Sequence, residues 1–365
     1  MNTVNLLPSA TAQSTLDSRF HAFGWGPEAE IPFQCIHHAI DTQIALQPQA
    51  VAVEHLDHSI SYADLDRLAS SLAARLAADG VRQGDAVGLF MRRGIHLVVG
   101  ILAVLRLGAA YVPKDAAIVP HTMLQQVIDG ARIRTVLTTR DHVDGLAADL
   151  ARANLMQVDL EQLAQDRASA PAVCGDRSDR CFVLFTSGTT GVPNGVEVTH
   201  ANVCNLLLCS PGDLGIRAGT RVGNVLNIAF DMASWEILAC LANGGTLVVR
   251  GSDFAACAAQ VNVLIATPSI LARLNPEDCP TMEAVAVAGE PCPQPLAEKW
   301  AAKCRFYIGC GPTEVTIVNT LGQYHCGDDA VTIGAPVPNT TVYVLDENLR
   351  PCAIGEVGEM WAGGD

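Results

Sequence analysis

The chain has 365 residues, of which 49% are hydrophobic and only 5% aromatic, and its formal net charge is −15. This length can bury a large core in two or three lobes, and the composition is typical of an α/β protein. The acidic balance argues against a nucleic-acid partner or an anionic membrane partner. A bound nucleotide would therefore depend on local N–H groups, metal ions and a few cations.

The chain is expected to be cytoplasmic, reduced and soluble. None of its 13 cysteines forms a C-x-x-C pair, which argues against a zinc or thioredoxin-type motif. The N-terminus lacks a basic region followed by an apolar stretch, so no signal peptide is predicted. The longest apolar run, residues 96–105, is too short to span a bilayer. Four cysteines in apolar surroundings are expected to be buried: Cys181, Cys204, Cys209 and Cys240.

The first half of the chain alternates predicted helices and strands after a leader, residues 1–30, that is expected to be disordered or loosely docked. Ser61 precedes a helical run with leucines at 65, 68, 72 and 76, which ends at Gly80. A strand is predicted over 85–90, a buried helix over 96–107 and a strand over 135–139. This alternation indicates parallel sheets with helical crossovers.

The second half repeats the pattern, with strands predicted at 246–249, 263–266 and 284–288. Strands at 342–346 and 358–361 are expected to form an antiparallel piece. The predicted division is therefore a leader (1–30), a first α/β subdomain (31–175), a second that holds the site (176–330) and the start of a β-barrel piece (331–365).

A loop rich in glycine, serine and threonine follows the apolar strand 181–185. Residues 186–195 contain four hydroxyls and three glycines, so backbone N–H groups and hydroxyls can converge on an anion. The composition suits a nucleotide polyphosphate. The spacing is not that of a P-loop, since no lysine follows the last glycine. A flexible surface loop remains the alternative.

Further segments in order along residues 50–365 resemble the core motifs of nonribosomal peptide synthetase adenylation domains, members of the adenylate-forming superfamily. They are residues 60–65, 107–113, the loop at 184–196, 230–236, Gly311-Pro312-Thr313-Glu314 and 351–364. The resemblance implies an α/β fold, namely the large lobe of an adenylate-forming enzyme. In that lobe two sheets are flanked by helices in a layered αβαβα arrangement, with a small distorted β-barrel.

The resemblance also implies the nucleotide site. The phosphates of ATP would be held by Thr186, Ser187, Gly188, Thr189, Thr190 and Gly191. Gly289 and Glu290 would border the adenine, at the carboxyl end of a predicted strand where ligands of open α/β sheets bind. Cys310 and Gly311 would also line the nucleotide. Thr313 would bind the α-phosphate or the substrate carboxylate, and Glu314 would hold Mg²⁺, which prefers carboxylate oxygens.

Asp231 narrows the substrate class. In amino-acid-activating relatives the matching aspartate pairs with the substrate ammonium, and a buried carboxylate needs such a cation. The alternative role of Asp231 is to cap a helix predicted over residues 233–241. By resemblance, the lining of the substrate pocket consists of Phe230, Met232, Trp235, Ile265, Ala286, Ala288, Gly309, Ile317 and Val318. Its apolar character favours a bulky hydrophobic or aromatic amino acid, with room left by the small residues.

The expected activity is conversion of an amino acid and MgATP to aminoacyl-AMP and pyrophosphate, followed by transfer to phosphopantetheine on a partner carrier protein domain. Two residues depart from the family pattern: Asn194 replaces the loop lysine, and Cys310 replaces a tyrosine that would pack on adenine. The C-terminal lobe with the catalytic lysine is expected to be missing, so this chain alone should turn over poorly. An acyl- or aryl-CoA synthetase and a non-catalytic binding remnant are the alternative functions.

Overall fold

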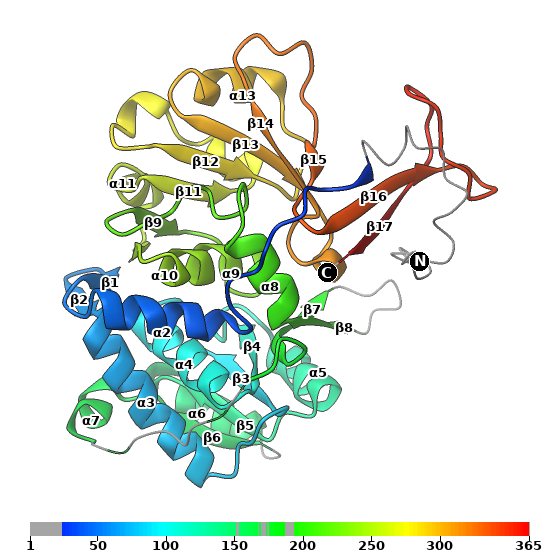
Figure 1. The fold of residues 1–365 in the computed structure, drawn as a ribbon. Coiled ribbons are helices and arrows are strands. Elements are labelled where there is room, and N and C mark those ends of the chain that lie inside the picture. The colour runs from blue at the N-terminus through cyan, green and yellow to red at the C-terminus, as the bar shows by residue number, and fades with distance from the viewer. Residues whose placement is uncertain are drawn as a thin grey trace.

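The computed structural model describes residues 24–150, 153–166, 168, 173, 175–186 and 193–364, with only the backbone described at 148 and 149. Two large sheets, each covered by helices, lie one above the other, and a small two-stranded sheet projects beside them (Figure 1). The α/β prediction is confirmed. Within the described residues the C-terminal piece is this single antiparallel pair, β16 (Thr340–Leu345) and β17 (Glu359–Gly364).

The lower sheet has six strands. In spatial order they are β6 (Asn154–Gln157), β5 (Thr135–Thr138), β3 (Ala86–Phe90), β4 (Ala110–Lys114), β7 (Arg180–Thr186) and β8 (Asn194–Thr199). All neighbours are parallel except β7 and β8, which pair antiparallel with Thr186 opposite Asn194. Helices α5 (His121–Ala131) and α6 (Arg140–Asp149) pack on one face. Helices α3 (Tyr62–Ala78) and α4 (Ile95–Arg106) contribute to the core on the other.

The upper sheet has nine strands. In spatial order they are β15 (Ala335–Pro336), β14 (Thr320–Tyr324), β13 (Arg305–Cys310), β12 (Ala284–Val287), β11 (Val263–Ala266), β9 (Arg221–Asn224), β10 (Thr246–Val249), β1 (Val51–His55) and β2 (His58–Ser61). The strands from β13 to β1 are parallel, and the outer pairs are antiparallel. The two sheets do not correspond to the predicted subdomains on either side of residue 175. Strands β1 and β2, which precede this residue, belong to the upper sheet, and β7 and β8, which follow it, belong to the lower sheet.

The remaining helices are short or cover sheet faces. They are α2 (Ile36–Leu46), α7 (Leu160–Gln165), α8 (His200–Leu207), α9 (Asp231–Ser234), α10 (Cys240–Ala242), α11 (Phe254–Ala258), α12 (Pro268–Leu271) and α13 (Gln294–Ala301), with a π-helix at Trp235–Ala239 and 3₁₀ turns at Pro276–Asp278 and Thr313–Val315. Among the described residues, none of these helices combines the length and the apolar character needed to span a bilayer.

Local sequence signals placed the predicted elements well. Ser61 caps α3 through a capping box with Asp64, since each side chain accepts the other residue's backbone N–H. The leucines at helical spacing are buried along α3, and α4 is buried along most of its length. All four cysteines expected in the core are buried.

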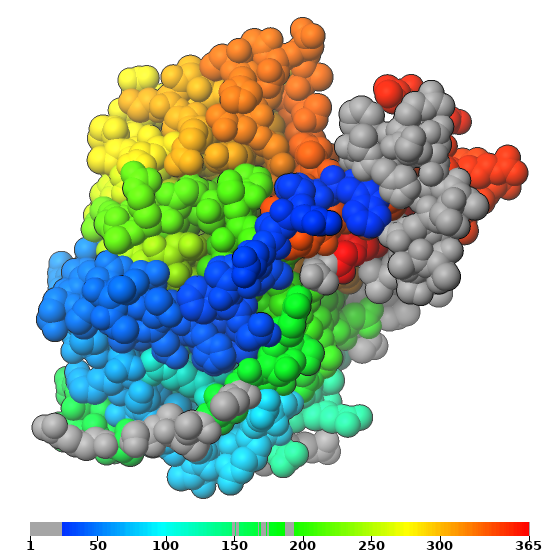
Figure 2. Space-filling model, viewed as in Figure 1, coloured from blue at the N-terminus to red at the C-terminus, as the bar shows by residue number. Residues whose placement is uncertain are grey.

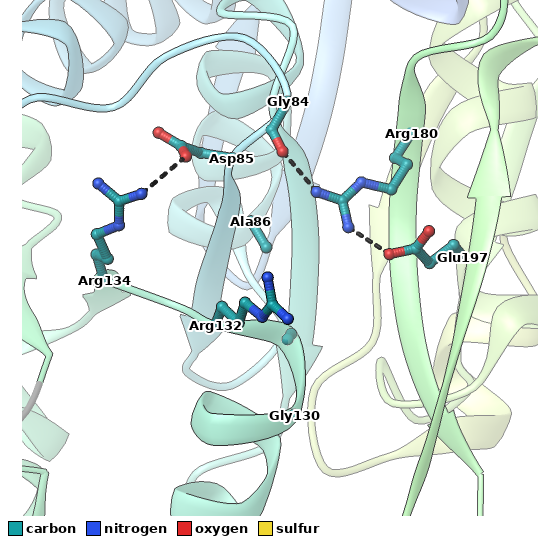
Figure 3. Close-up of a pocket in the computed structure, with 9 residues that line it drawn as sticks. Gly84, Asp85, Ala86, Gly130, Arg132, Arg134, Arg180 and Glu197 are labelled. Atoms are coloured by element: carbon teal, nitrogen blue, oxygen red, sulfur yellow. Dashed lines mark hydrogen bonds and ion pairs between the residues drawn. The ribbon is translucent and has the colours of Figure 1, made fainter.

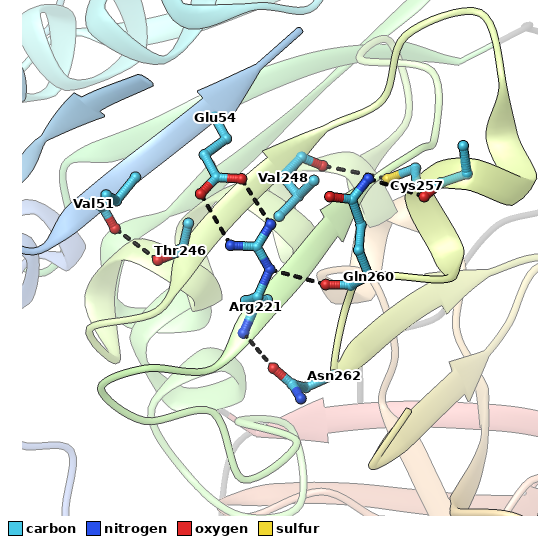
Figure 4. A network of polar contacts seen from close by, with 9 residues as sticks. Val51, Glu54, Arg221, Thr246, Val248, Cys257, Gln260 and Asn262 are labelled. Carbon is cyan, nitrogen blue, oxygen red and sulfur yellow. Dashed lines mark hydrogen bonds and ion pairs between the residues drawn. The ribbon is translucent and has the colours of Figure 1, made fainter. Parts of the chain in front are cut away.

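A network of polar contacts fixes β1 to the upper sheet (Figure 4). The guanidinium of Arg221 on β9 donates two hydrogen bonds to the Glu54 carboxylate, at 3.0 and 2.7 Å, and a third to the carbonyl of Gln260 at 2.9 Å. The Arg221 hydrogen bond holds the pKa of Glu54 below its usual value. The Thr246 hydroxyl donates to the Val51 carbonyl at 2.7 Å. These bonds join segments far apart in sequence.

Part of the predicted leader is docked. Figure 2 shows the dark blue N-terminal segment lying across the front of the molecule before it enters α2. Trp25 bridges to Thr341 of β16, and the Gly26 N–H donates to the Thr340 carbonyl at 2.8 Å. A Cβ at Gly26 would lie 2.0 Å from the Val337 carbonyl oxygen, so only glycine fits there. Residues 24–30 of the predicted leader are therefore docked, and residues 1–23 lie outside the described residues.

Candidate active site

The predicted site residues lie where strands of both sheets end. Asp231 follows β9 in the chain, Gly289 follows β12, and Gly311 follows β13, all in the parallel part of the upper sheet. Thr186 is the last residue of β7 in the lower sheet. Carboxyl ends of parallel strands are the usual ligand-binding edge of open α/β sheets.

Asp231 is buried and opens helix α9 as its first residue, with Phe230 as the N-cap. Burial raises the pKa of the Asp231 carboxyl, and the nearby Glu314 carboxylate adds to the rise. Hydrogen bonds from the Thr313 hydroxyl and from the backbone N–H of Met232 act in the opposite direction. The three residues Asp231, Thr313 and Glu314 therefore interact. The alternative role of Asp231 as a helix cap is not supported, because Phe230 is the N-cap of α9 and no side chain caps this helix.

Thr313 and Glu314 form a 3₁₀ turn directly after β13, in which Thr313 is half-buried and Glu314 is exposed. An exposed carboxylate next to a second carboxyl group offers oxygen ligands of the kind that Mg²⁺ prefers. The turn is followed by Thr316 and Ile317, both at positive φ, 64° and 68°. β-Branched residues rarely adopt this conformation, so the turn is a strained feature of the site.

Gly311 permits that turn to fold back on the strand. A Cβ at this position would lie 2.6 Å from Cα of Val318 and 2.9 Å from the backbone nitrogen of Asn319. The Asn319 N–H donates to the Cys310 carbonyl at 3.0 Å, which closes the loop between β13 and β14. The Cys310 side chain is half-buried, and burial raises the pKa of its thiol.

The predicted pocket lining is apolar and mostly buried. Phe230 is the exception, with 65% of its surface exposed. Trp235 is fully buried and its indole N–H donates to the Gly212 carbonyl at 2.7 Å, so its ring is held in the core. A Cβ at Gly309 would meet side-chain atoms of Val318 at 3.0 Å and Leu321 at 3.1 Å. The space beside Gly309 is thus already filled. The other lining residues, all buried, are Met232, Ile265, Ala286, Ala288, Ile317 and Val318.

Gly289 and Glu290 form the turn after β12. Gly289 has a φ of +83°, and its missing Cβ would lie 3.8 Å from the Met232 sulfur, at the edge of the pocket lining. The Glu290 carboxylate accepts the backbone N–H of Ser269 at 3.0 Å and also the Ser269 hydroxyl. The Ser269 hydrogen bond is the main reason that the pKa of Glu290 is lowered. This carboxylate is therefore held against the start of α12.

The loop predicted to bind phosphates is described only at its two ends. Thr186 and Asn194 face each other across the β7–β8 pair, whereas Ser187, Gly188, Thr189, Thr190 and Gly191 lie outside the described residues.

Sequence reasoning missed two groups near these strands. Lys114 is a buried lysine at the end of β4, and Glu236 is a fully buried carboxyl in the π-helix after Asp231. Lys114 directly follows the motif at residues 107–113, and Glu236 is the last residue of the motif at 230–236. No sequence pattern reveals, however, that these charged residues are buried.

The cavity in Figure 3 lies at the opposite edge of the lower sheet. It has a volume of about 410 Å³ and is lined by residues that begin β3 and β7 and end α5, among them Arg132, Arg134 and Arg180. Arg180 pairs with Glu197 and donates to the Gly84 carbonyl. Because this is the amino edge of the parallel strands, the cavity is separate from the predicted site.

Three potential metal ligands meet far from these residues in sequence. The ligand atoms of Cys35, His37 and His38, at the start of α2, lie within 4.8 Å of one another, and no second such group occurs in the described part of the chain. The His37 ring also stands edge-on to that of His200, with 5.3 Å between the ring centroids. These three residues do not belong to a C-x-x-C pair, so the absence of that motif does not exclude a metal at this position.

Comparisons with known proteins identify the family and the fold of the chain. The family model described as AMP-binding enzyme matches residues 40–365. Two adenylate-forming reductases of Coprinopsis cinerea are each 44% identical over 94% of this chain. Gramicidin S synthase 1 of Brevibacillus brevis is 30% identical over 93% of it. The chain spans 34% of the length of each reductase and 32% of that of the synthase.

Solved structures share the fold. The N-terminal subdomain of Klebsiella oxytoca NpsA, in complex with 3-hydroxybenzoyl-AMSN, aligns with a TM-score of 0.80 at 24% identity, over 91% of this chain and 88% of that one. The nonribosomal peptide synthetase FmoA3, in an AMPPNP-bound form, aligns with a TM-score of 0.85 at 24% identity, over 96% of this chain and 40% of that one. The chain therefore belongs to the AMP-binding enzyme family, and its fold is that of the N-terminal subdomain of adenylate-forming enzymes.

Proposed function

We propose that this chain provides the nucleotide and substrate site of an enzyme that adenylates an amino acid. A carboxylate oxygen of the substrate attacks the α-phosphorus of MgATP, pyrophosphate leaves, and aminoacyl-AMP is formed. Thr313 would bind the α-phosphate or the carboxylate, and Glu314 would hold Mg²⁺. Their contribution is positioning and charge neutralisation, on which phosphoryl chemistry chiefly depends.

The buried Asp231 carries this proposal. Its carboxyl interacts with the Thr313 hydroxyl and the Glu314 carboxylate, and no arginine or lysine among the described residues contributes to its electrostatics. Two neighbouring carboxyl groups without a cation of their own favour binding of positive charge. An ammonium group of the substrate at Asp231, and Mg²⁺ at Glu314, would supply it. A carboxylic acid without an amino group offers no such partner.

The apolar lining supports a bulky hydrophobic or aromatic amino acid. Because the space beside Gly309 is filled by Val318 and Leu321, room for a side chain would come chiefly from Ala286 and Ala288. A charged substrate side chain would be left without a partner in this lining, at a cost of several kcal/mol. Transfer of the aminoacyl group to phosphopantetheine on a carrier domain is the expected next step, as the similarity to peptide synthetases suggests.

The similarity to the two reductases supports a second candidate for the whole protein. In that case the activated acyl group would be reduced after adenylation, by a part of the protein outside this chain and with a hydride donor. The adenylation step would be the same. The substrate beside Asp231 would then be a carboxylic acid of another class.

The test is ATP–pyrophosphate exchange by the full-length protein across a panel of amino, keto and aryl acids, for the wild type and Asp231→Asn. We expect exchange with large apolar amino acids, and a loss of about tenfold to a hundredfold in kcat/KM in the variant, the value of one charged hydrogen bond. Asp278→Asn, which changes an exposed aspartate, is the matched control. Exchange with keto or aryl acids alone, equal in wild type and variant, would overturn the amino-acid assignment.

A further inference from the structure

The start of helix α2 brings together three side chains that can bind a metal ion. Cys35 is the N-cap residue of the helix, where its sulfur caps no backbone N–H, and His37 and His38 lie in the first turn. Their ligand atoms, one sulfur and two imidazole nitrogens, lie within 4.8 Å of one another. Two ligands of a tetrahedral zinc ion lie about 3.4–3.6 Å apart, because the Zn–S and Zn–N bonds are about 2.3 and 2.0–2.1 Å long. Small rotations of the side chains therefore suffice to close the three ligands on an ion.

His37 is buried without a partner for one of its ring nitrogens. The residue is 3% exposed, and its Nδ1 has no hydrogen-bond partner. A buried polar atom of this kind is costly, and an ion that binds the ring is one way to offset the cost. The ring of His200, whose centroid lies 5.3 Å from that of His37, has a different role. Its Nδ1 accepts the backbone N–H of Ile36 at 3.3 Å, so His200 holds the start of α2 in place.

The backbone at Gly175 leaves space beside these ligands. A Cβ at this position would lie 2.8 Å from the Cys35 sulfur and 3.7 Å from Nε2 of His37. Any side chain here would press against two of the three ligands, whereas glycine keeps them uncovered. The carbonyl oxygen of the next residue, Asp176, lies 3.5 Å from the Cys35 sulfur, which donates to it. Because His38 is only half-buried, an ion can reach the ligands from the solvent side.

The charges near the sulfur favour a cation, and the ligand types select which one. Burial, with the carboxylates of Asp179 and Asp176 as further causes, raises the pKa of the Cys35 thiol to about 12. The same carboxylates would stabilise a dication bound to the sulfur. On binding, the S–H bond of Cys35 is replaced by a bond from sulfur to the metal, and the proton leaves to solvent. Thiolate and imidazole ligands together suit zinc, whereas Mg²⁺ prefers oxygen ligands.

We propose that Cys35, His37 and His38 bind a zinc ion, with a water molecule in the fourth position on the solvent side. One sulfur, two nitrogens and one oxygen make up a tetrahedral set that zinc accepts. The ion would fasten the start of α2 to the segment that precedes β7. None of the residues proposed for adenylation belongs to this site, so the proposal does not depend on that function.

The test titrates Zn²⁺ and Co²⁺, each alone, into the full-length protein after reduction and removal of metal with a chelator. The wild type should bind one zinc ion per chain more than Cys35→Ser, and its Co²⁺ form should show a sulfur-to-cobalt charge-transfer absorption that the variant lacks. The Zn²⁺ affinity of the site should fall by more than about a hundredfold, since the loss of outer partners of a ligand alone costs about 10–100-fold. Cys326→Ser removes an exposed thiol next to the exposed His325 and should leave both readouts unchanged.

Two further variants separate metal binding from folding. His38→Gln removes a half-buried ligand and should weaken Zn²⁺ binding to a similar extent. Gly175→Ala keeps all three ligands and should weaken it as well, because the new Cβ would lie 2.8 Å from the Cys35 sulfur. Zn²⁺ should raise the unfolding temperature of the wild type more than that of each variant. Equal zinc affinities and cobalt spectra in the wild type and Cys35→Ser, or a wild type that binds no zinc, would overturn the proposal. Neither result bears on adenylation, which ATP–pyrophosphate exchange tests separately.

Discussion

The Glu236 carboxyl illustrates how a single residue can couple stability to pH. It is fully buried and accepts hydrogen bonds from the Asn224 amide at 2.7 Å and from the N–H groups of Val225 and Leu226 at 2.9 and 3.2 Å. Burial raises the pKa of Glu236 to about 8, although these bonds oppose the rise. The folded chain therefore keeps a proton that the unfolded chain releases above the ordinary carboxyl pKa.

From this follows a pH dependence with a definite sign. The pKa of Glu236 is higher in the folded chain than in the unfolded chain. Its contribution to the free energy of unfolding is therefore fully present below the unfolded pKa and is lost as the pH rises towards about 8. Between pH 6 and 8 the wild type should lose about 2 kcal/mol more unfolding free energy than Glu236→Gln. Glutamine mimics the protonated acid, and Asn224 can turn its amide to accept from it. Urea unfolding of both proteins at the two pH values measures this, and equal losses would contradict it.

At the scale of elements, the turn between β13 and β14 sets the position of Thr313 and Glu314. It combines two left-handed β-branched residues with the close approach of Gly311 to Val318. Strain of this kind persists only where the surrounding structure enforces it. The motif Gly311-Pro312-Thr313-Glu314 is thus constrained on both sides, by the end of β13 and by the return of the chain into β14.

Gly311→Ala should damage both stability and activity. Its Cβ would lie 2.6 Å from the Val318 Cα, so the turn must move, at about 1–3 kcal/mol of unfolding free energy and with displacement of Thr313. Urea unfolding and ATP–pyrophosphate exchange measure the two effects. In the control, Gly145→Ala in α6, the new Cβ meets its nearest neighbour at 4.0 Å. That variant should gain up to about 1 kcal/mol and keep full exchange. A Gly311→Ala protein as stable and active as the wild type would contradict the role of this contact.

At the scale of the whole molecule, sequence patterns predicted individual strands and helices but not how the two sheets share them. Helix α3 and strands such as β11 follow from local spacing alone. The placement of β1 in the upper sheet depends on contacts such as Thr246 to Val51, 195 residues apart, which no local pattern encodes. The same contrast between local patterns and long-range packing holds for the site. The motifs predict roles for Asp231 and for the turn at Thr313 and Glu314, whereas the burial of Lys114 and the filled space beside Gly309 arise from packing between strands.

The shared core predicts that both sheets unfold together. One contiguous buried cluster contains Leu89 of the lower sheet and Val222 of the upper sheet, so opening either sheet exposes the same apolar surface. The fully buried tryptophans Trp235 and Trp300 follow β9 and precede β13 in the chain, so their fluorescence reports on the surroundings of the upper sheet. Leu89→Ala should cost about 2–5 kcal/mol and shift the urea midpoint of tryptophan fluorescence as far as that of far-UV circular dichroism. If the fluorescence transition stayed in place while the dichroism transition split in two, the sheets would unfold independently, and the covering helices rather than the common core would limit the stability of each.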